Sequence, residues 1–340
     1  MIVRHSRGEY PIHWRLSPDF LRDFEPSRHF LLTDQTVWEL WLSSVWPADR
    51  AVIVPAGESS KSIPVYESCV RKLAEARVHR SETLIAVGGG VVGDLGGFVA
   101  ATVLRGIPFV QVPTTMMSML DSSVGGKVGI DLPEGKNLVG SFWPPITVEI
   151  CPQFLSTLPK RHVANGLAEA IKMGFIRHPE LLAQVKPTLE SPVESAEVIR
   201  SCIQAKAAVV EEDEFETTGV RATLNFGHTV GHAIEQVLNY EDLLHGEAVA
   251  IGMVAEALIG ERLGFTERGI HQIVRRACEE ISLPTRHSCL IEPDRLIECM
   301  KRDKKSDASG ISMSLLSSVG TCKLVRKVEE SAIRESLMQL

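Results

Sequence analysis

Four short apolar runs alternate with helical patterns over the first 150 residues, and this alternation constrains the fold more than any other feature of the chain. The runs read as buried strands at Phe30–Thr33, Ala51–Pro55, Thr83–Val87 and Phe109–Pro113. Between the second and the third run, Val65–Ala76 has the pattern of an amphipathic helix. Strands that alternate with helices are typical of a layered α/β domain with a parallel sheet, whose ligands bind at the carboxyl ends of the strands.

From about Pro152 onwards, long helical patterns replace this alternation. They cover Lys160–Ile176, Val193–Glu212, Ala222–Asn239, Gly246–Leu263 and Thr266–Ser282, and a short strand-like piece at Ile311–Leu316 precedes a C-terminal helix. A chain of 340 residues is long enough for two domains, each with its own core. We therefore expect an α/β nucleotide-binding domain over residues 1–150 and a mainly α-helical domain over residues 151–340, with the boundary near Trp143.

A glycine-rich turn, Gly88–Asp94, follows the third apolar run and opens an apolar helix. It matches G-x-G-x-x-G in the strand–turn–helix setting that a pyrophosphate site requires. One match is weak evidence, because glycines also serve helix–sheet packing and the acidic residue expected about 20 residues later is absent. We predict dinucleotide binding here, although not in the usual Rossmann manner. Asp34 and Glu58–Lys61 are further polar groups at strand ends, where solvated turns are the alternative interpretation.

A second glycine-rich run, Asp121–Asn137, combines glycines with Lys127 and Lys136. Glycines let backbone N–H groups approach a ligand closely, and lysines supply the positive charge that an anion needs. We therefore expect this run to form the floor of a site for an anionic ligand.

Three histidines and a glutamate of the helical half form a candidate metal site. His228 and His232 share one face of a predicted helix, His245 opens the next one, and Glu169 lies in an apolar helix. A glutamate and two histidines would leave one coordination position open for substrate, as in catalytic zinc sites. The spacing does not decide which two histidines bind, and hydrogen-bonded structural histidines are the alternative. An uncoordinated histidine beside a metal would be suited to proton transfer near neutral pH.

The composition narrows the choice of partner and compartment. The net charge of −7 disfavours nucleic acid, so basic groups that converge would serve a small anion. Lys206, Arg221, Lys304 and Lys305 are candidates, although each alone fits a solvated helix face. Seven scattered cysteines fit free thiols in a reducing compartment. Since we find no signal peptide and no apolar membrane span, we expect a cytoplasmic protein without a membrane partner.

Taken in order and spacing, the motifs resemble those of 3-dehydroquinate synthase from Glu9 to Gly320. The matching motifs begin at Gly88, Arg105, Val112, Asp121, Gly135, Gly166, Leu224 and His245. The resemblance implies the dehydroquinate synthase-like fold, a homodimer, catalytic NAD and a divalent metal, zinc or cobalt. It also implies a lyase of the shikimate pathway, which leads to aromatic amino acids. That enzyme converts 3-deoxy-D-arabino-heptulosonate 7-phosphate into 3-dehydroquinate and phosphate by oxidation, phosphate elimination, reduction and aldol closure.

The resemblance further assigns roles to particular residues. It implies metal ligation by Glu169, His228 and His245, with His232 as their proton-handling neighbour. The residues implied in NAD binding are Asp34, Gly57, Glu58, Lys61, Gly90, Val91, Val92, Gly93, Asp94, Thr114, Thr115, Lys127, Lys136, Phe154, Leu155, Ser156 and Thr157. The residues implied in substrate binding are Arg105, Asp121, Lys127, Asn137, Lys172, Lys206, Arg221, Asn225 and either Lys304 or Lys305.

Two departures from the family pattern and three alternatives stand beside this interpretation. The stretch from Glu216 to Arg221 is one residue longer than usual, and Asp131 replaces a frequent asparagine, which adds a negative charge near the anion site.

Related sugar-phosphate cyclases share the scaffold but commonly alter the run that begins at Asp121. Polyol dehydrogenases with metal and NAD lack the lysine run and accumulate NADH. A non-catalytic metabolite-binding regulator would lack metal ligands, and this chain has them all.

Overall fold

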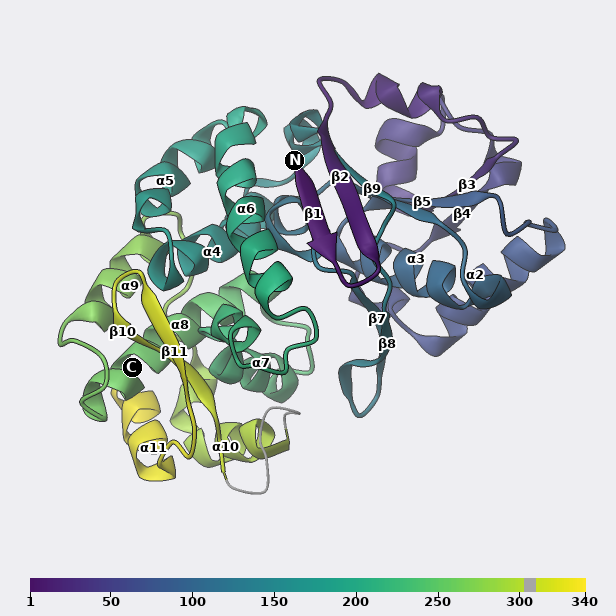
Figure 1. The fold of residues 1–340 in the computed structure, drawn as a ribbon. Coiled ribbons are helices and arrows are strands. Elements are labelled where there is room, and N and C mark those ends of the chain that lie inside the picture. The colour runs from purple at the N-terminus through teal and green to yellow at the C-terminus, as the bar shows by residue number, and fades with distance from the viewer. Residues whose placement is uncertain (303–309) are drawn as a thin grey trace. The chain divides into compact units, whose positions relative to one another are not determined.

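The structure, a computed structural model, describes residues 1–302 and 310–340. Contacts within the chain divide it into two compact units (Figure 1). The first unit comprises Met1–Leu158 with Pro192–Ile199, and the second comprises Pro159–Ser191 with Arg200–Leu340. The units thus divide after Leu158, and a short later segment belongs to the first of them.

The first unit is built on a seven-stranded sheet with the order β1-β2-β9-β6-β5-β3-β4. Its strands are β1 (Ile2–His5), β2 (Gly8–Trp14), β3 (His29–Asp34), β4 (Ala51–Val54), β5 (Thr83–Gly88), β6 (Phe109–Pro113) and β9 (Thr147–Ile150). All neighbours are parallel except β1 and β2, the purple hairpin in Figure 1. The four apolar runs of the sequence are β3, β4, β5 and β6, as predicted, because strands buried on both faces are continuously apolar.

Two helices, α2 (Ile63–Glu75) and α3 (Gly90–Thr102), pack together and against this sheet, and a short helix, α1 (Gln35–Val37), follows β3. The core of this layer includes Leu32, Leu84 and Phe109 from the strands and Leu95 from α3. It also takes in Ile130 from a separate two-stranded hairpin, β7 (Lys127–Leu132) and β8 (Gly135–Phe142). The glycine-rich run Asp121–Asn137, in which we predicted no strand, is thus largely part of a hairpin that packs on α3.

The second unit is mainly helical, as expected. Its helices are α4 (Lys160–Ile176), α5 (Leu182–Glu190), α6 (Ala196–Glu212, which begins in the first unit), α7 (His228–Val237), α8 (His245–Arg262), α9 (Ile270–Glu279), α10 (Pro293–Arg302) and α11 (Glu330–Gln339). The helix α8 contacts α4, α7, α9 and α11 and is buried almost throughout, from Gly246 to Gly260 (Figure 1). A helix that is apolar on all sides belongs in such a central place.

Three predictions about the elements of this unit need correction. The single helix expected over Ala222–Asn239 is wrong, because a 3₁₀ turn (Arg221–Asn225) ends before α7 begins at His228. The helix expected over Thr266–Ser282 is shorter, since α9 starts at Ile270. The late strand is β10 (Met313–Ser318), and it pairs with a strand that we missed, β11 (Thr321–Val325).

Candidate active site

Four neighbouring parallel strands of the first unit carry predicted cofactor residues at their carboxyl ends. Thr114 follows β6, the glycine turn that opens α3 follows β5, Asp34 ends β3 and Gly57 follows β4. Because parallel strands end at the same edge of a sheet, these groups lie along one edge. The backbone N–H groups at the start of α3 lie there as well, and such a helix start favours an anion.

The glycine turn also has a packing role that requires no ligand. A Cβ atom added to Gly93 would lie 2.6 Å from Oε1 of Gln111 on β6, and one added to Gly88 would lie 2.5 Å from Cβ of Val92. Both contacts are too short for any larger residue without a shift. The match to G-x-G-x-x-G is therefore explained partly by helix–sheet packing, which was the alternative interpretation.

Several predicted cofactor residues have structural partners of their own. Asp34 accepts a hydrogen bond at 3.0 Å from the backbone N–H of Val37 and so caps α1, while its burial raises its pKa. The segment Phe154–Thr157 lies in a 3₁₀ turn in which Phe154 and Leu155 are buried. Only polar or backbone atoms of that segment remain for a ligand.

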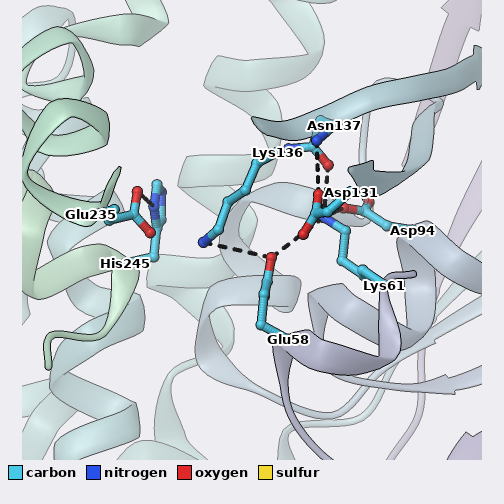
Figure 2. A network of polar contacts seen from close by, with 8 residues as sticks. All are labelled: Glu58, Lys61, Asp94, Asp131, Lys136, Asn137, Glu235 and His245. Carbon is cyan, nitrogen blue, oxygen red and sulfur yellow. Dashed lines mark hydrogen bonds and ion pairs between the residues drawn. The ribbon is translucent and has the colours of Figure 1, made fainter. Parts of the chain in front are cut away.

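A cluster of charged side chains surrounds Lys61, which is buried with 5% of its side chain exposed (Figure 2). Its Nζ donates to Oδ2 of Asp94 at 2.8 Å and to Oδ1 of Asn137 at 2.7 Å. Glu58 and Asp131 lie 3.7 and 3.8 Å from the same ammonium, and Lys136 lies 3.6 Å from Glu58. Burial alone would lower the pKa of Lys61, but the three carboxylates outweigh it and raise the pKa. Predicted cofactor residues and the hairpin residue Asn137 thus share one network.

Of the other predicted substrate residues of this unit, Arg105 and Asp121 lie in irregular backbone, and Lys127 begins a strand. Leu104 and Arg105 have φ angles of 51° and 65°, which are rare for residues other than glycine and concentrate at functional sites. Asp121 lies in a π-helical turn, Ser118–Ser122, and turns of this kind are frequent at functional sites. Lys127 is exposed at the start of β7.

In the second unit, the structure brings together the residues that we predicted as metal ligands. Among the described residues, ligand atoms of Glu169 on α4, His228 at the start of α7 and His245 at the start of α8 lie within 4.8 Å of one another. The ring of His232 lies 5.3 Å from that of His228 and 5.8 Å from that of His245. A second possible ligand set is His232, Glu235 and His245.

Hydrogen bonds indicate which ring nitrogen of each histidine carries a proton. His228 Nδ1 lies 3.2 Å from the backbone oxygen of Phe226, and His245 Nδ1 lies 3.2 Å from Oε2 of Glu235 (Figure 2). A carbonyl and a carboxylate only accept, so both Nδ1 atoms donate, and in the neutral form of each ring Nε2 carries the lone pair that a metal would bind. His228 Nε2 lies 3.7 Å from Oε1 of Glu169. This is the arrangement that metal-binding histidines adopt.

Glu169 is the strongest indication of a cation. It is buried, and its Oε2 forms an ion pair with the ammonium of Lys172, whereas its Oε1 has no hydrogen-bond donor among the described residues. Buried carboxylates are costly unless they are hydrogen-bonded or bind a cation. Glu235, by contrast, already accepts from His245. The set Glu169, His228 and His245 therefore fits a divalent metal better than the second set does.

Residues that we had not singled out hold the helix starts in place. Glu256 on α8 is fully buried, and its two oxygens accept from the backbone N–H groups of Gly227 at 2.7 Å and Val230 at 3.0 Å, which caps α7. Glu247 accepts two hydrogen bonds from Arg161 at 2.7 and 2.8 Å and a third at 2.8 Å from the backbone N–H of Leu244, the residue before α8. The sequence signal for Glu256 was a carboxylate inside an otherwise apolar helix.

The basic groups predicted to bind substrate are buried in this unit: Lys172 on α4, Lys206 on α6 and Arg221.

The longer loop before Arg221 is organised by Asp213, whose carboxylate accepts three backbone N–H hydrogen bonds from that loop. Burial opposes the charge of Asp213, but these donors outweigh it and lower its pKa. Despite the extra residue, Glu216 accepts a hydrogen bond from the amide of Asn225 at 3.1 Å.

Lys304 and Lys305 lie outside the described residues. Among the described residues, every helix is too short or too polar to traverse a lipid bilayer.

The sequence matches two protein-family models that together span residues 51–306. Residues 51–165 match the N-terminal model of 3-dehydroquinate synthase and residues 166–306 match its C-terminal model. The chain belongs to the 3-dehydroquinate synthase family. It is 47% identical to the 3-dehydroquinate synthase of Methylacidiphilum infernorum over 80% of this chain and 75% of that one. It is 42% identical to that of Methylococcus capsulatus over 94% of this chain and 92% of that one.

Solved structures show the same fold. A 2-epi-5-epi-valiolone synthase from Streptomyces hygroscopicus, solved with NAD⁺ and Zn²⁺, superposes with a TM-score of 0.86 at 25% identity, covering 100% of this chain and 98% of that one. The 3-dehydroquinate synthase fold class is thereby confirmed. The expected activity, that of a shikimate-pathway lyase, is confirmed by relatives that share 40–47% identity, and the other cyclases and the dehydrogenases are not favoured.

Proposed function

We propose that this member of the 3-dehydroquinate synthase family uses a divalent metal at Glu169, His228 and His245 and NAD at the carboxyl edge of its sheet. It would convert 3-deoxy-D-arabino-heptulosonate 7-phosphate into 3-dehydroquinate and phosphate. The observation that carries the proposal is the buried carboxylate of Glu169, whose Oε1 has no hydrogen-bond donor among the described residues and lies 3.7 Å from Nε2 of His228. The Nδ1 atoms of His228 and His245 are both already engaged.

These ligands suit zinc or cobalt. Two imidazole nitrogens and one carboxylate oxygen form a set with an open position, which catalytic metals of this kind use for substrate. A metal bound there would act as a Lewis acid on a substrate oxygen, and NAD would supply reversible hydride transfer. Zinc and cobalt are both found in solved structures of related cyclases.

The basic groups would orient a substrate that carries both a phosphate and a carboxylate. In the second unit, Lys172, Lys206 and Arg221 are buried, and a cation held in a site of low dielectric binds an anion more strongly than one in water. In the first unit, Arg105, Lys127 and Asn137 would contribute, with Asp121 at a ring hydroxyl. Positioning the phosphate near the proton to be removed accelerates elimination through proximity.

His232 would hold and move a proton. Its ring lies 5.3 Å from that of His228, yet it is outside the ligand set that we favour. An imidazole nitrogen titrates near neutral pH and can pass a proton to or from a substrate oxygen.

The NAD site would be the strand-end edge of the first unit. The helix start at Gly90–Asp94 suits the pyrophosphate, and Glu58, Lys61 and Lys136 form the charged network beyond the end of β4. We assign this role mainly to the α/β half (residues 1–150), and we assign metal binding and the buried basic groups for the substrate to the helical half (residues 151–340).

The activity is tested by incubating purified protein with the heptulosonate phosphate, NAD and zinc. We expect phosphate and dehydroquinate in equal amounts, no accumulation of NADH, loss of activity with a chelator and recovery with zinc or cobalt. Accumulation of NADH in step with substrate consumption would contradict cyclisation.

The ligand set is tested with His245→Ala, which should lose metal binding while His271→Ala keeps it. His271 makes a matched control because its Nδ1 also contacts a carboxylate, Glu261 at 2.8 Å, in neither candidate ligand set. Full metal affinity in His245→Ala would refute the assignment. A homodimer and a cytoplasmic location stay predictions, and light scattering on the purified protein measures the first.

A further inference from the structure

The hairpin β7–β8 contains a bulge opposite Asp131. The strands pair regularly from Lys127 opposite Phe142 to Ile130 opposite Val139, and then the register shifts so that Leu132 lies opposite Gly135. Asp131 alone therefore faces three residues of β8, Lys136, Asn137 and Leu138. A bulge removes residues from the ladder and re-aims their side chains, and bulges are frequent beside active sites. Here it carries both a proposed cofactor lysine and a proposed substrate asparagine.

The side chain of Asp131 makes a hydrogen bond to the bulged strand where the ladder is interrupted. Its Oδ1 accepts from the backbone N–H of Asn137 at 2.7 Å, and Asn137 has a left-handed φ of 54°. Asparagine tolerates this conformation better than most residues do. The backbone N–H of Asp131 also donates to the backbone oxygen of Lys61 at 2.7 Å. Asp131 thus connects the bulge with the turn that carries Glu58 and Lys61.

The bulge in turn presents its side chains to that turn (Figure 2). Asn137 Oδ1 accepts from Lys61 Nζ at 2.7 Å, and Lys136 Nζ lies 3.6 Å from Oε1 of Glu58. Lys61 already has a carboxylate at hydrogen-bond distance, Asp94 at 2.8 Å, whereas Asp131 lies 3.8 Å from it. Asp131 therefore makes its hydrogen bond to the Asn137 N–H, and the ammonium of Lys61 acts on it through charge across a longer distance.

We propose that Asp131 is a positioning residue, whose carboxylate oxygen pins the bulge so that Lys136 and Asn137 are held for cofactor and substrate. This inference rests on the proposed function for the roles of those two residues. In this role Asp131 needs only an oxygen atom that accepts a hydrogen bond. The side chain of asparagine also has such an oxygen, whereas that of alanine has none.

The test compares Asp131→Ala with Asp131→Asn, and Glu134→Ala is the matched control because Glu134 is an exposed carboxylate in the same hairpin. Loss of a hydrogen bond to a charged group corresponds to about tenfold or more in an equilibrium constant. We expect Asp131→Ala to speed exchange of the Asn137 amide hydrogen about tenfold. It should raise KM for the heptulosonate phosphate and the Kd for NAD by a similar factor, with a smaller change in kcat.

Asp131→Asn should restore exchange, KM and Kd to within about threefold of the wild-type values, because the acceptor is kept. Glu134→Ala should match the wild type. Unchanged exchange and KM in Asp131→Ala would overturn the proposal, and so would an asparagine variant as impaired as the alanine one. If the wild-type protein forms no dehydroquinate, the proposed function fails, whereas amide exchange and NAD affinity still test the role of Asp131.

Discussion

Replacing Glu235 by glutamine should weaken metal binding about tenfold, although Glu235 is not in the ligand set that we favour. Its carboxylate is buried and accepts from Nδ1 of His245 at 3.2 Å, which orients the ring and increases the basicity of Nε2. A hydrogen bond to a charged group contributes about 1.5–3 kcal/mol and a neutral one about 0.5–1.5 kcal/mol. The difference, about 1–1.5 kcal/mol, corresponds to roughly five- to fifteenfold in affinity.

The assay is a competition titration of metal-free protein with zinc against a chromophoric chelator. Glu261→Gln is the matched control, because Glu261 contacts Nδ1 of His271 at 2.8 Å on another helix and belongs to neither candidate ligand set. The control should bind zinc as the wild type does. Equal affinities of all three proteins would refute the positioning role of Glu235.

The same titration separates the two candidate ligand sets. If His232, Glu235 and His245 held the metal, Glu235→Gln would remove a ligand and abolish binding, whereas Glu169→Gln would leave it largely intact. We expect the opposite order, with the severe loss in Glu169→Gln. We expect that order because Glu235 already accepts a hydrogen bond from His245, whereas Oε1 of Glu169 has no donor among the described residues.

Three further predictions concern stability and reactivity. Gly97→Ala should lower the free energy of unfolding, measured in urea, by about 1–3 kcal/mol, because the new Cβ would lie 2.3 Å from Cγ1 of Val128. Adding Val128→Ala should recover part of this loss. If the effects of the two substitutions on the free energy of unfolding simply added, the clash would be contradicted. Burial raises the pKa of Asp131 in the folded protein, so the contribution of this carboxyl to stability is present below pH 3.8 and is lost as the pH rises through the folded pKa. The Tm of Asp131→Asn minus that of the wild type should therefore rise over that pH range. A difference that falls with pH would contradict this prediction. Burial raises the pKa of Cys69 and Cys278 to about 12, so neither should react with a thiol reagent at pH 8 until the protein unfolds, as peptide mapping can check.

The sheet of the first unit could be predicted where its strands are buried on both faces. The strands β3, β5 and β6 have nearly continuous burial, so their apolar runs were sufficient. The hairpin β7–β8 was missed because its glycines and lysines read as a loop. What makes it a hairpin is the packing of Val128 and Ile130 on α3, and Gly97 permits that approach. A partner so distant in sequence leaves no local signal.

The helical unit shows the same limit at the start of α7. The pattern over Ala222–Asn239 is continuous, yet the structure interrupts it at Gly227, whose φ is 82°. A Cβ there would lie 2.4 Å from Cγ of Met253 on α8, and Glu256 on the same helix caps the new helix start. The break therefore depends on α8, and it makes His228 the first residue of α7 instead of an interior one.

In the motif His245-Gly-Glu, the position of the proposed metal ligand His245 depends on the two residues that follow it, Gly246 and Glu247. A Cβ on Gly246 would lie 2.0 Å from the backbone oxygen of Asn165 on α4, and the N–H of Gly246 donates to the side chain of Asn165 at 2.6 Å. Glu247 then holds Arg161, also on α4, so α8 begins directly against the helix that carries Glu169. Sequence identified the motif but not this contact. Because the contact between α8 and α4 places His245 beside Glu169, Gly246 and Glu247 position the site although neither is a proposed ligand.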